Sequence, residues 1–120
     1  MIVRVAPGET STVELPGRTL HAFLRAGDGR CRTMSVHRAA FPGRSRPEGH
    51  VHAAEDEAVY VLSVSGRIVT PGSTAELQPG VFVLIPSGTF HATESGDQGL
   101  ELLCVFSPPV VLGSYETAPA

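Results

Sequence analysis

The segment that decides how this chain is interpreted is His-Val-His-Ala-Ala-Glu-Asp-Glu, residues 50–57. Side chains two residues apart on a strand point to the same face, so we expect His50 and His52 to lie side by side. Glu57 follows after four residues, a gap long enough for a bend that returns its carboxylate from the next strand. Imidazole and carboxylate groups together suit one divalent ion of Fe, Mn, Ni, Co or Zn.

A second informative segment is Gly-Val-Phe-Val-Leu-Ile-Pro-Ser-Gly-Thr-Phe-His, residues 80–91. A Pro-Gly turn leads into an apolar strand. Pro86 and Gly88 then provide the fixed φ and the positive φ of a turn that reverses the chain. His91 emerges on an antiparallel partner strand, so the two segments make sense as parts of one site.

The remainder of the chain has the composition of one small antiparallel β domain. Its 120 residues are 42% hydrophobic and include 13 Gly and 10 Pro, which favours many short elements joined by turns. No window has the periodicity and caps of an amphipathic helix, so parallel βαβ folds are not expected. The predicted strands are Ile2–Val5, Ser11–Leu15, Thr19–Leu24, Arg32–Phe41, Val59–Val64, Arg67–Val69, Thr74–Leu77, Val81–Ile85, Thr89–Thr93 and Leu100–Phe106, with a turn at residues 96–99.

The charge pattern argues against a nucleic-acid partner. The net charge is −3, and Arg44 and Arg46 are the densest basic pair, so no basic stripe is visible. No apolar run approaches the roughly 18 residues of a membrane-spanning helix, and residues 1–5 lack the pattern of a signal peptide. We expect a cytoplasmic protein with no membrane partner, whose Cys31 and Cys104 are free, buried thiols.

Together the two segments resemble the signature motifs of the cupin superfamily, in its small single-domain bacterial form. The second motif, G-x5-P-x-G-x2-H-x3-N, matches with every interval correct at Gly80, Pro86, Gly88 and His91. The first motif, G-x5-H-x-H-x3,4-E-x6-G, matches at His50, His52 and Glu57. The resemblance covers roughly residues 32–106.

Three positions depart from the family pattern. The glycine expected seven residues after Glu57 is Val64, the leading glycine falls one residue early at Gly43, and the terminal Asn is Ser95. These positions shape turns and are not metal ligands, so the ligand set is complete.

The resemblance implies an antiparallel double-stranded β-helix, the jelly-roll cupin barrel. Residues 1–120 would form one cupin domain, with N-terminal strands in 1–31, a core in 32–106 and a C-terminal tail in 107–120 that runs over the surface or covers a barrel mouth. His50, His52, Glu57 and His91 would hold one divalent transition-metal ion. The resemblance also implies a homodimer paired through N-terminal strands, for which the edge at Ile2–Val5 is a suitable donor.

Three imidazoles and one carboxylate leave about two open positions on a six-coordinate ion, which is typical of a reactive metal site. Inward-facing strand residues beside the ligands would make the pocket apolar and suited to an aromatic or hydrophobic small molecule that chelates the metal. We expect these residues to be Val59, Val61, Phe82 and Val83. Arg44 and Arg46 could meet an anionic substrate at the barrel mouth.

For this ligand set the resemblance most often implies a dioxygenase, in which Glu57 serves as ligand or as base. Isomerases, lyases and polyketide-modifying cyclases share the fold, and a non-catalytic module that binds a metal or small ligand is the alternative from another class. Outside the motifs, His21 and His37 are interpreted as strand-surface or core-edge residues. Asp56 is the fallback ligand, and Tyr60 should face away from Glu57.

Overall fold

Residues that alternate between buried and more exposed positions form the strands of this protein. In β3 (Ser35–Phe41) every second residue, beginning with Ser35, is buried, as expected when one face of an antiparallel sheet covers a core. The computed structural model describes residues 1–113, and within them it has no α-helix. The all-β prediction is therefore confirmed. No helix in this range has the length and apolar character that membrane crossing requires.

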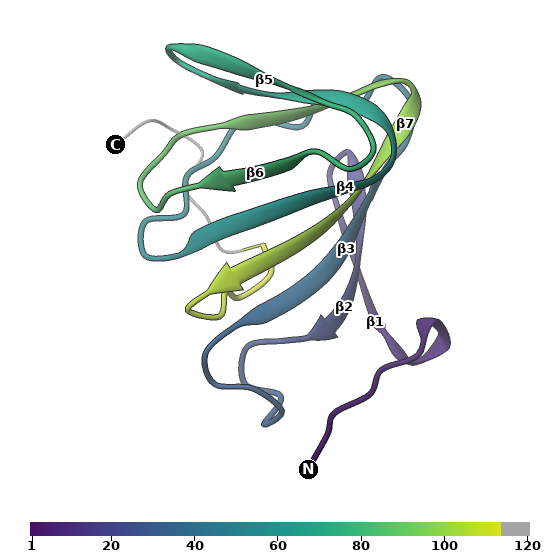
Figure 1. The fold of residues 1–120 in the computed structure, drawn as a ribbon, viewed down its shortest axis with the longest axis vertical. Coiled ribbons are helices and arrows are strands. Elements are labelled where there is room, and N and C mark those ends of the chain that lie inside the picture. Colours follow the sequence, from purple (N-terminus) through teal and green to yellow (C-terminus); the bar gives the residue numbers. More distant parts are fainter. Residues whose placement is uncertain (114–120) are drawn as a thin grey trace.

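One 3₁₀ helix and seven strands follow one another along the chain (Figure 1): η1 (Pro7–Glu9), β1 (Ser11–Leu15), β2 (Arg18–Leu24), β3, β4 (Asp56–Thr70), β5 (Ser73–Leu77), β6 (Phe82–Ile85) and β7 (Ala92–Ser107). All pairs are antiparallel, in the order β1-β2-β3-β7-β4-β5, and β6 also pairs with β4. The first part of β4 is flanked by β6 and β7 and its last part by β5 and β7, so the sheet curls around these two long strands.

Strands β4 and β7 are each longer than the sequence predicts. The two segments predicted at Val59–Val64 and Arg67–Val69 are continuous in β4. The turn predicted at residues 96–99 is wrong, because the β4–β7 ladder resumes on its far side, with Val64 opposite Leu100 and Gly66 opposite Ser95. The glycines of this segment therefore bend β7 in a bulge and do not reverse it.

The N-terminal strand predicted at Ile2–Val5 is also wrong. Residues 1–6 lie outside the sheet, and Met1 and Ile2 are among the most exposed hydrophobic residues of the described chain. The first strand is instead β1, which pairs with β2. The strand that was expected to pair two copies does not form within the single chain. The homodimer stays a prediction.

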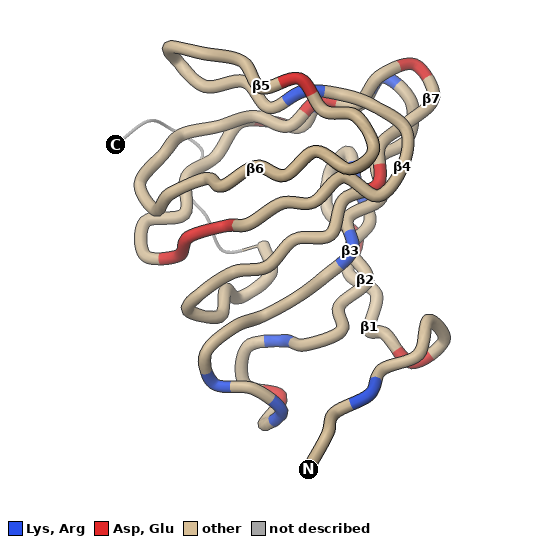
Figure 2. Tube along the Cα trace, in the orientation of Figure 1, with Lys and Arg blue, Asp and Glu red and all other residues tan. Residues whose placement is uncertain are grey.

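The core lies inside the curl of the sheet and takes residues from most of its strands. It consists of Leu20, Ala39, Phe41, Val59, Val61, Ile68, Leu77, Ile85, Leu100, Leu102, Cys104, Phe106 and Val110. The opposite face of β4 and β6 is exposed, as Tyr60 and its cross-strand partner Phe82 show. Tyr60 thus faces away from Glu57, as predicted. Charged residues lie mainly toward strand ends and turns, and β6 carries none (Figure 2).

Val64 has an unusual backbone conformation for a β-branched residue. Its φ is +62°, in the left-handed region where Cβ lies too close to the following carbonyl oxygen. Glycine has no Cβ and adopts this conformation without that steric cost. It lies where the β4–β7 register shifts, between Val61 and Gly66. This is the position at which the cupin pattern has glycine, so the chain retains the backbone turn without the residue that favours it.

We predict that Val64→Gly raises the free energy of unfolding by about 1 kcal/mol, because relief of the left-handed strain exceeds the loss of a half-buried side chain. Urea denaturation of metal-free protein measures it. Val64→Ala is the matched control, because it removes the branched side chain but keeps Cβ. A glycine variant no more stable than the alanine variant would contradict the prediction.

Candidate metal centre

Two histidines from distant segments are paired through their backbones. The amide of His50 donates to the carbonyl of His91 at 2.8 Å, and the amide of His91 donates to the carbonyl of His50 at 2.9 Å. This isolated antiparallel bridge joins the segment before β4 to the segment before β7. The backbone therefore holds the two imidazoles close together, with ring centroids 4.5 Å apart.

The turn between β6 and β7 fixes the neighbouring segment. Gly88, with a φ of +81°, donates its amide to the carbonyl of His52 at 2.9 Å. The amide of Ser87 donates to Asp56 Oδ1 at 2.9 Å. Asp56 is exposed and binds this turn, so the fallback assignment of Asp56 as a ligand is wrong. Its role is to connect the start of β4 to the loop that precedes His91.

Three imidazoles converge in the wall of a cavity beside the core. One ring nitrogen from each of His50, His52 and His91 can be chosen so that all three lie within 4.8 Å of one another. Nitrogens bound to the same ion lie about 3–4 Å apart, given metal–nitrogen bonds of about 2.1 Å. The cluster therefore fits a transition-metal ion after the nitrogen–nitrogen distances shorten by about 1–2 Å at most.

Glu57 points toward the same place from β4. Its Oε1 lies 3.5 Å from His91 Nε2 and 3.9 Å from His52 Nε2, and the residue is only 8% exposed. An uncompensated buried carboxylate is costly, so a cation or protonated imidazole is needed beside it. Its position is that of a fourth ligand or of a base next to the three imidazoles.

His91 is oriented by its second ring nitrogen. Nδ1 lies 3.0 Å from the carbonyl oxygen of Thr89, and because a carbonyl only accepts, Nδ1 is the donor. Nε2 therefore faces Glu57 and the cluster and can bind a metal. Burial acts to lower the pKa of His91, but the carboxylate of Glu57 outweighs it, and the pKa is raised above its usual value.

The other members of the cluster are shifted in the opposite direction. Burial, helped by the neighbouring His91 and His52, lowers the pKa of His50 to about 4. Burial also lowers the pKa of His52. For Glu57, burial acts to raise the pKa, but His91 and His52 outweigh it and the carboxyl pKa is lowered. At neutral pH His50 and His52 are thus neutral and Glu57 is ionised, which are the states that bind a metal.

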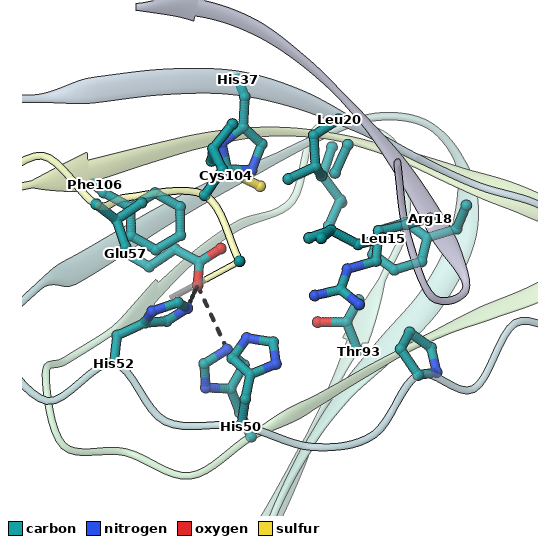
Figure 3. Close-up of a pocket in the computed structure, with 18 of the residues that line it drawn as sticks. Leu15, Arg18, Leu20, His37, His50, His52, Glu57, Thr93, Cys104 and Phe106 are labelled. Carbon is teal, nitrogen blue, oxygen red and sulfur yellow. Dashed lines mark ion pairs between the residues drawn. The ribbon is translucent and has the colours of Figure 1, made fainter. Parts of the chain in front are cut away.

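The cluster lies in the wall of a cavity, and Figure 3 shows the side chains that line it. Most of its other lining residues are apolar: Leu15, Leu20, Ala39, Phe41, Pro47, Leu102, Phe106, Val110, Val111 and Leu112. Val110–Gly113 belong to the chain after β7, and the amide of Val110 is held by Ser35 Oγ at 3.0 Å. This part of the predicted tail therefore forms cavity wall.

The four residues predicted to make the pocket apolar lie elsewhere. Val59 and Val61 share the inward face with Glu57, but they are packed in the core beyond the cavity. Val83 packs against that core, and Phe82 is 61% exposed. None of the four lines the cavity. The alternation of side chains along a strand correctly predicts that Val59 and Val61 face inward. It does not predict whether an inward residue packs in the core or lines the cavity.

The two arginines predicted at the barrel mouth are also outside the cavity. Arg44 forms an exposed ion pair with Asp97 at 2.9 Å. Arg46 donates to the carbonyl oxygens of Ser45 and Ser95 and lies beside Glu94. Their guanidinium groups fasten the loop before the histidine segment to the bend of β7.

Sequence reasoning missed five polar residues of the cavity, namely Arg18, His37, Glu48, Thr93 and Cys104. His37 is 5% exposed and lines the cavity beside core residues, so of its two predicted positions the strand surface is wrong and the edge of the core agrees with the structure. In the predicted strand His37 lies on the same face as Ala39 and Phe41, and this spacing indicates a buried side chain. Both thiols are free, but only Cys104 is buried, and Cys31 is half-buried.

A curled antiparallel β-sheet with a histidine cluster in the wall of its cavity is typical of small metal-binding jelly-roll proteins. The sequence profile of the cupin domain matches residues 40–106. The chain belongs to the cupin family, and the predicted jelly-roll barrel is confirmed.

Three known proteins illustrate the relationship. L-ectoine synthase of Bordetella parapertussis is 37% identical over 73 residues, which cover 58% of this chain and 53% of the synthase. The chain thus spans about half the length of that curated relative. The uncharacterised protein SCO3923 of Streptomyces coelicolor is 32% identical over 96 residues, 75% of this chain and 90% of that protein. The structure of the polyketide cyclase RemF from Streptomyces resistomycificus matches with a TM-score of 0.79 and 24% identity, over 98% of this chain and 86% of RemF.

We predict that Co²⁺ affinity falls as the pH drops through the raised pKa of His91, because a metal must displace the proton from Nε2. Below that pKa the affinity should fall about tenfold per pH unit. Isothermal titration in buffers of different ionisation enthalpy measures both the affinity and the proton release. Glu57→Gln removes the carboxylate that raises the pKa of His91, so the onset of the fall should move to lower pH. An affinity independent of pH between 8 and 5.5 would contradict this.

Proposed function

We propose that this chain is a metal-dependent enzyme that acts on a small, largely apolar molecule able to chelate the metal. His50, His52, His91 and Glu57 hold one divalent transition-metal ion. The observation that carries the proposal is the convergence of three imidazoles, two of them buried and that of His50 half-buried, and one buried carboxylate in the wall of a mainly apolar cavity.

The donor set favours a reactive ion over a structural one. Four protein ligands leave about two positions of an octahedral ion open toward the cavity, whereas structural zinc in small domains is closed by four ligands and usually recruits thiolates. When bound, such an ion acts as a Lewis acid toward an oxygen of the substrate.

The side chains of the chain itself prepare the site. The apolar wall excludes water and strengthens every charge interaction near the cluster. The Thr89 carbonyl holds the ring of His91 in one orientation. Glu57 completes the ligand set, and it is also the carboxylate best placed to accept a proton from a molecule bound beside His52 and His91.

For the reaction type we favour non-oxidative chemistry of the isomerase, lyase or cyclase kind. The sequence similarity to L-ectoine synthase supports a synthase more than an oxygenase. A dioxygenase is the second candidate, because open positions on one ion would allow substrate and oxygen to bind together. A binding module without turnover is the outcome if neither chemistry is found.

We predict that His52→Ala abolishes both metal binding and turnover while the barrel survives, because the imidazole is a ligand and its backbone contacts are unchanged. Metal content by elemental analysis and unfolding by circular dichroism test the two parts separately. His21→Ala, in β2 and outside the cavity, is the matched control and should keep full metal content. A His52→Ala protein with full metal occupancy would overturn the ligand assignment.

Elemental analysis of protein purified without added metal or chelator, combined with oxygen-uptake assays, separates the candidate reactions. We expect about one equivalent of a divalent transition metal per chain and no oxygen uptake on metal-chelating ketones and phenols. Iron together with oxygen uptake on these compounds would replace the proposed non-oxidative reaction with a dioxygenase.

A further inference from the structure

His37 is a buried polar residue that the proposed metal site does not use. It lies on the inward face of β3 with its side chain toward the cavity (Figure 3). Its cross-strand neighbour on β7 is Cys104. The nitrogens that can hold the ion belong to His50, His52 and His91, so His37 is a separate polar group in the same cavity.

The packing around His37 supports its ring but leaves the ring nitrogen Nδ1 without a hydrogen-bond partner among residues 1–113. One ring face stacks on Phe106, with centroids 5.5 Å apart and an interplanar angle of 27°. Nδ1 is buried and has no hydrogen-bond partner in the described part of the chain. Buried polar atoms in native proteins nearly always have a partner. An imidazole 95% buried beside an apolar cavity therefore calls for a partner that arrives with the ligand.

The surroundings keep this imidazole uncharged. Burial lowers the pKa of His37 to about 4; Glu57 opposes this shift, while Arg18 and His52 add to it. A dication at the cluster would act in the same direction as Arg18. A neutral imidazole offers one N–H donor and one acceptor, so His37 acts by hydrogen bonding and supplies no positive charge, which suits a hydroxyl or carbonyl oxygen.

We propose that His37 determines specificity by hydrogen-bonding a hydroxyl or carbonyl oxygen of the substrate other than the oxygens held at the histidine cluster. The inference rests on the proposed function. It narrows the substrate class to small, mainly apolar molecules with two oxygen functions, a chelating end and a second, uncharged oxygen. The other polar residues of the lining are Arg18, Glu48, Thr93 and Cys104, and none of them hydrogen-bonds Nδ1 of His37. A substrate lacking the second oxygen would therefore leave this nitrogen unsatisfied.

Two matched pairs of diphenols test the proposal on Co²⁺-loaded protein under anaerobic conditions. Pyrogallol is compared with 3-methylcatechol, and 1,2,4-benzenetriol with 4-methylcatechol, so that each pair differs only in a hydroxyl or methyl group outside the chelating diol. Binding is followed by the visible absorption of Co²⁺. In wild type we expect one triol to bind about tenfold tighter than its methyl partner, the contribution of one buried hydrogen bond.

The variants separate hydrogen bonding from packing. His37→Phe keeps a ring to stack on Phe106 but has no polar atom, so the preference for the triol should vanish while the affinity for the methylcatechols is retained. His37→Gln restores a donor and an acceptor and should recover part of the preference. His21→Phe, outside the cavity, should behave as wild type.

The outcomes are distinguishable from failure of the proposed function. If wild type binds Co²⁺ and the methylcatechols but prefers neither triol, or if His37→Phe keeps the preference, the role of His37 is overturned and the metal site stands. If wild type binds no Co²⁺, or the diphenols leave its spectrum unchanged, the proposed function and this inference fall together.

Discussion

The reciprocal backbone hydrogen bonds between His50 and His91 are the constraint on which the site depends. They join two loops that approach the barrel from different parts of the chain, and the Gly88–His52 and Ser87–Asp56 contacts extend the same junction. Because the backbone carries these contacts, the imidazoles are brought together without any ion. The conformational entropy lost in ordering the ligand residues is therefore lost on folding, and metal binding does not have to order these segments.

Two opposing electrostatic effects act within this junction. Burial favours neutral groups and lowers the pKa of His50 and His52, whereas the ionised Glu57 favours a proton on His91. A proton on His91 and a metal at the cluster are thus alternative counter-charges for the same carboxylate. Either the protonated imidazole of His91 or a bound metal ion can lie beside the Glu57 carboxylate. The carboxylate therefore need not be buried without a counter-charge.

Much of this arrangement could be predicted from the sequence where local spacing decides it. The His50–His52 pair, the turn at Pro86–Gly88 and the outward position of Tyr60 follow from strand periodicity and turn chemistry. Depth and long-range contacts do not follow from these rules. Val59 faces inward, as predicted, but it packs in the core and does not line the cavity. Arg46 donates a hydrogen bond to the carbonyl oxygen of Ser95 in the distant bend of β7. His37 was missed because no motif marks it; only the closed barrel places it beside the cluster.

The wall formed by Val110–Gly113 has a consequence for how such a protein can diverge. This segment follows the last strand and is not part of the sheet, yet it contributes apolar surface to the cavity. Substitutions there change the shape offered to a ligand without disturbing a strand pair or a histidine. Selection can thus act on ligand choice and on the barrel that carries the histidine cluster at separate rates, so close relatives with the same cluster need not share a substrate.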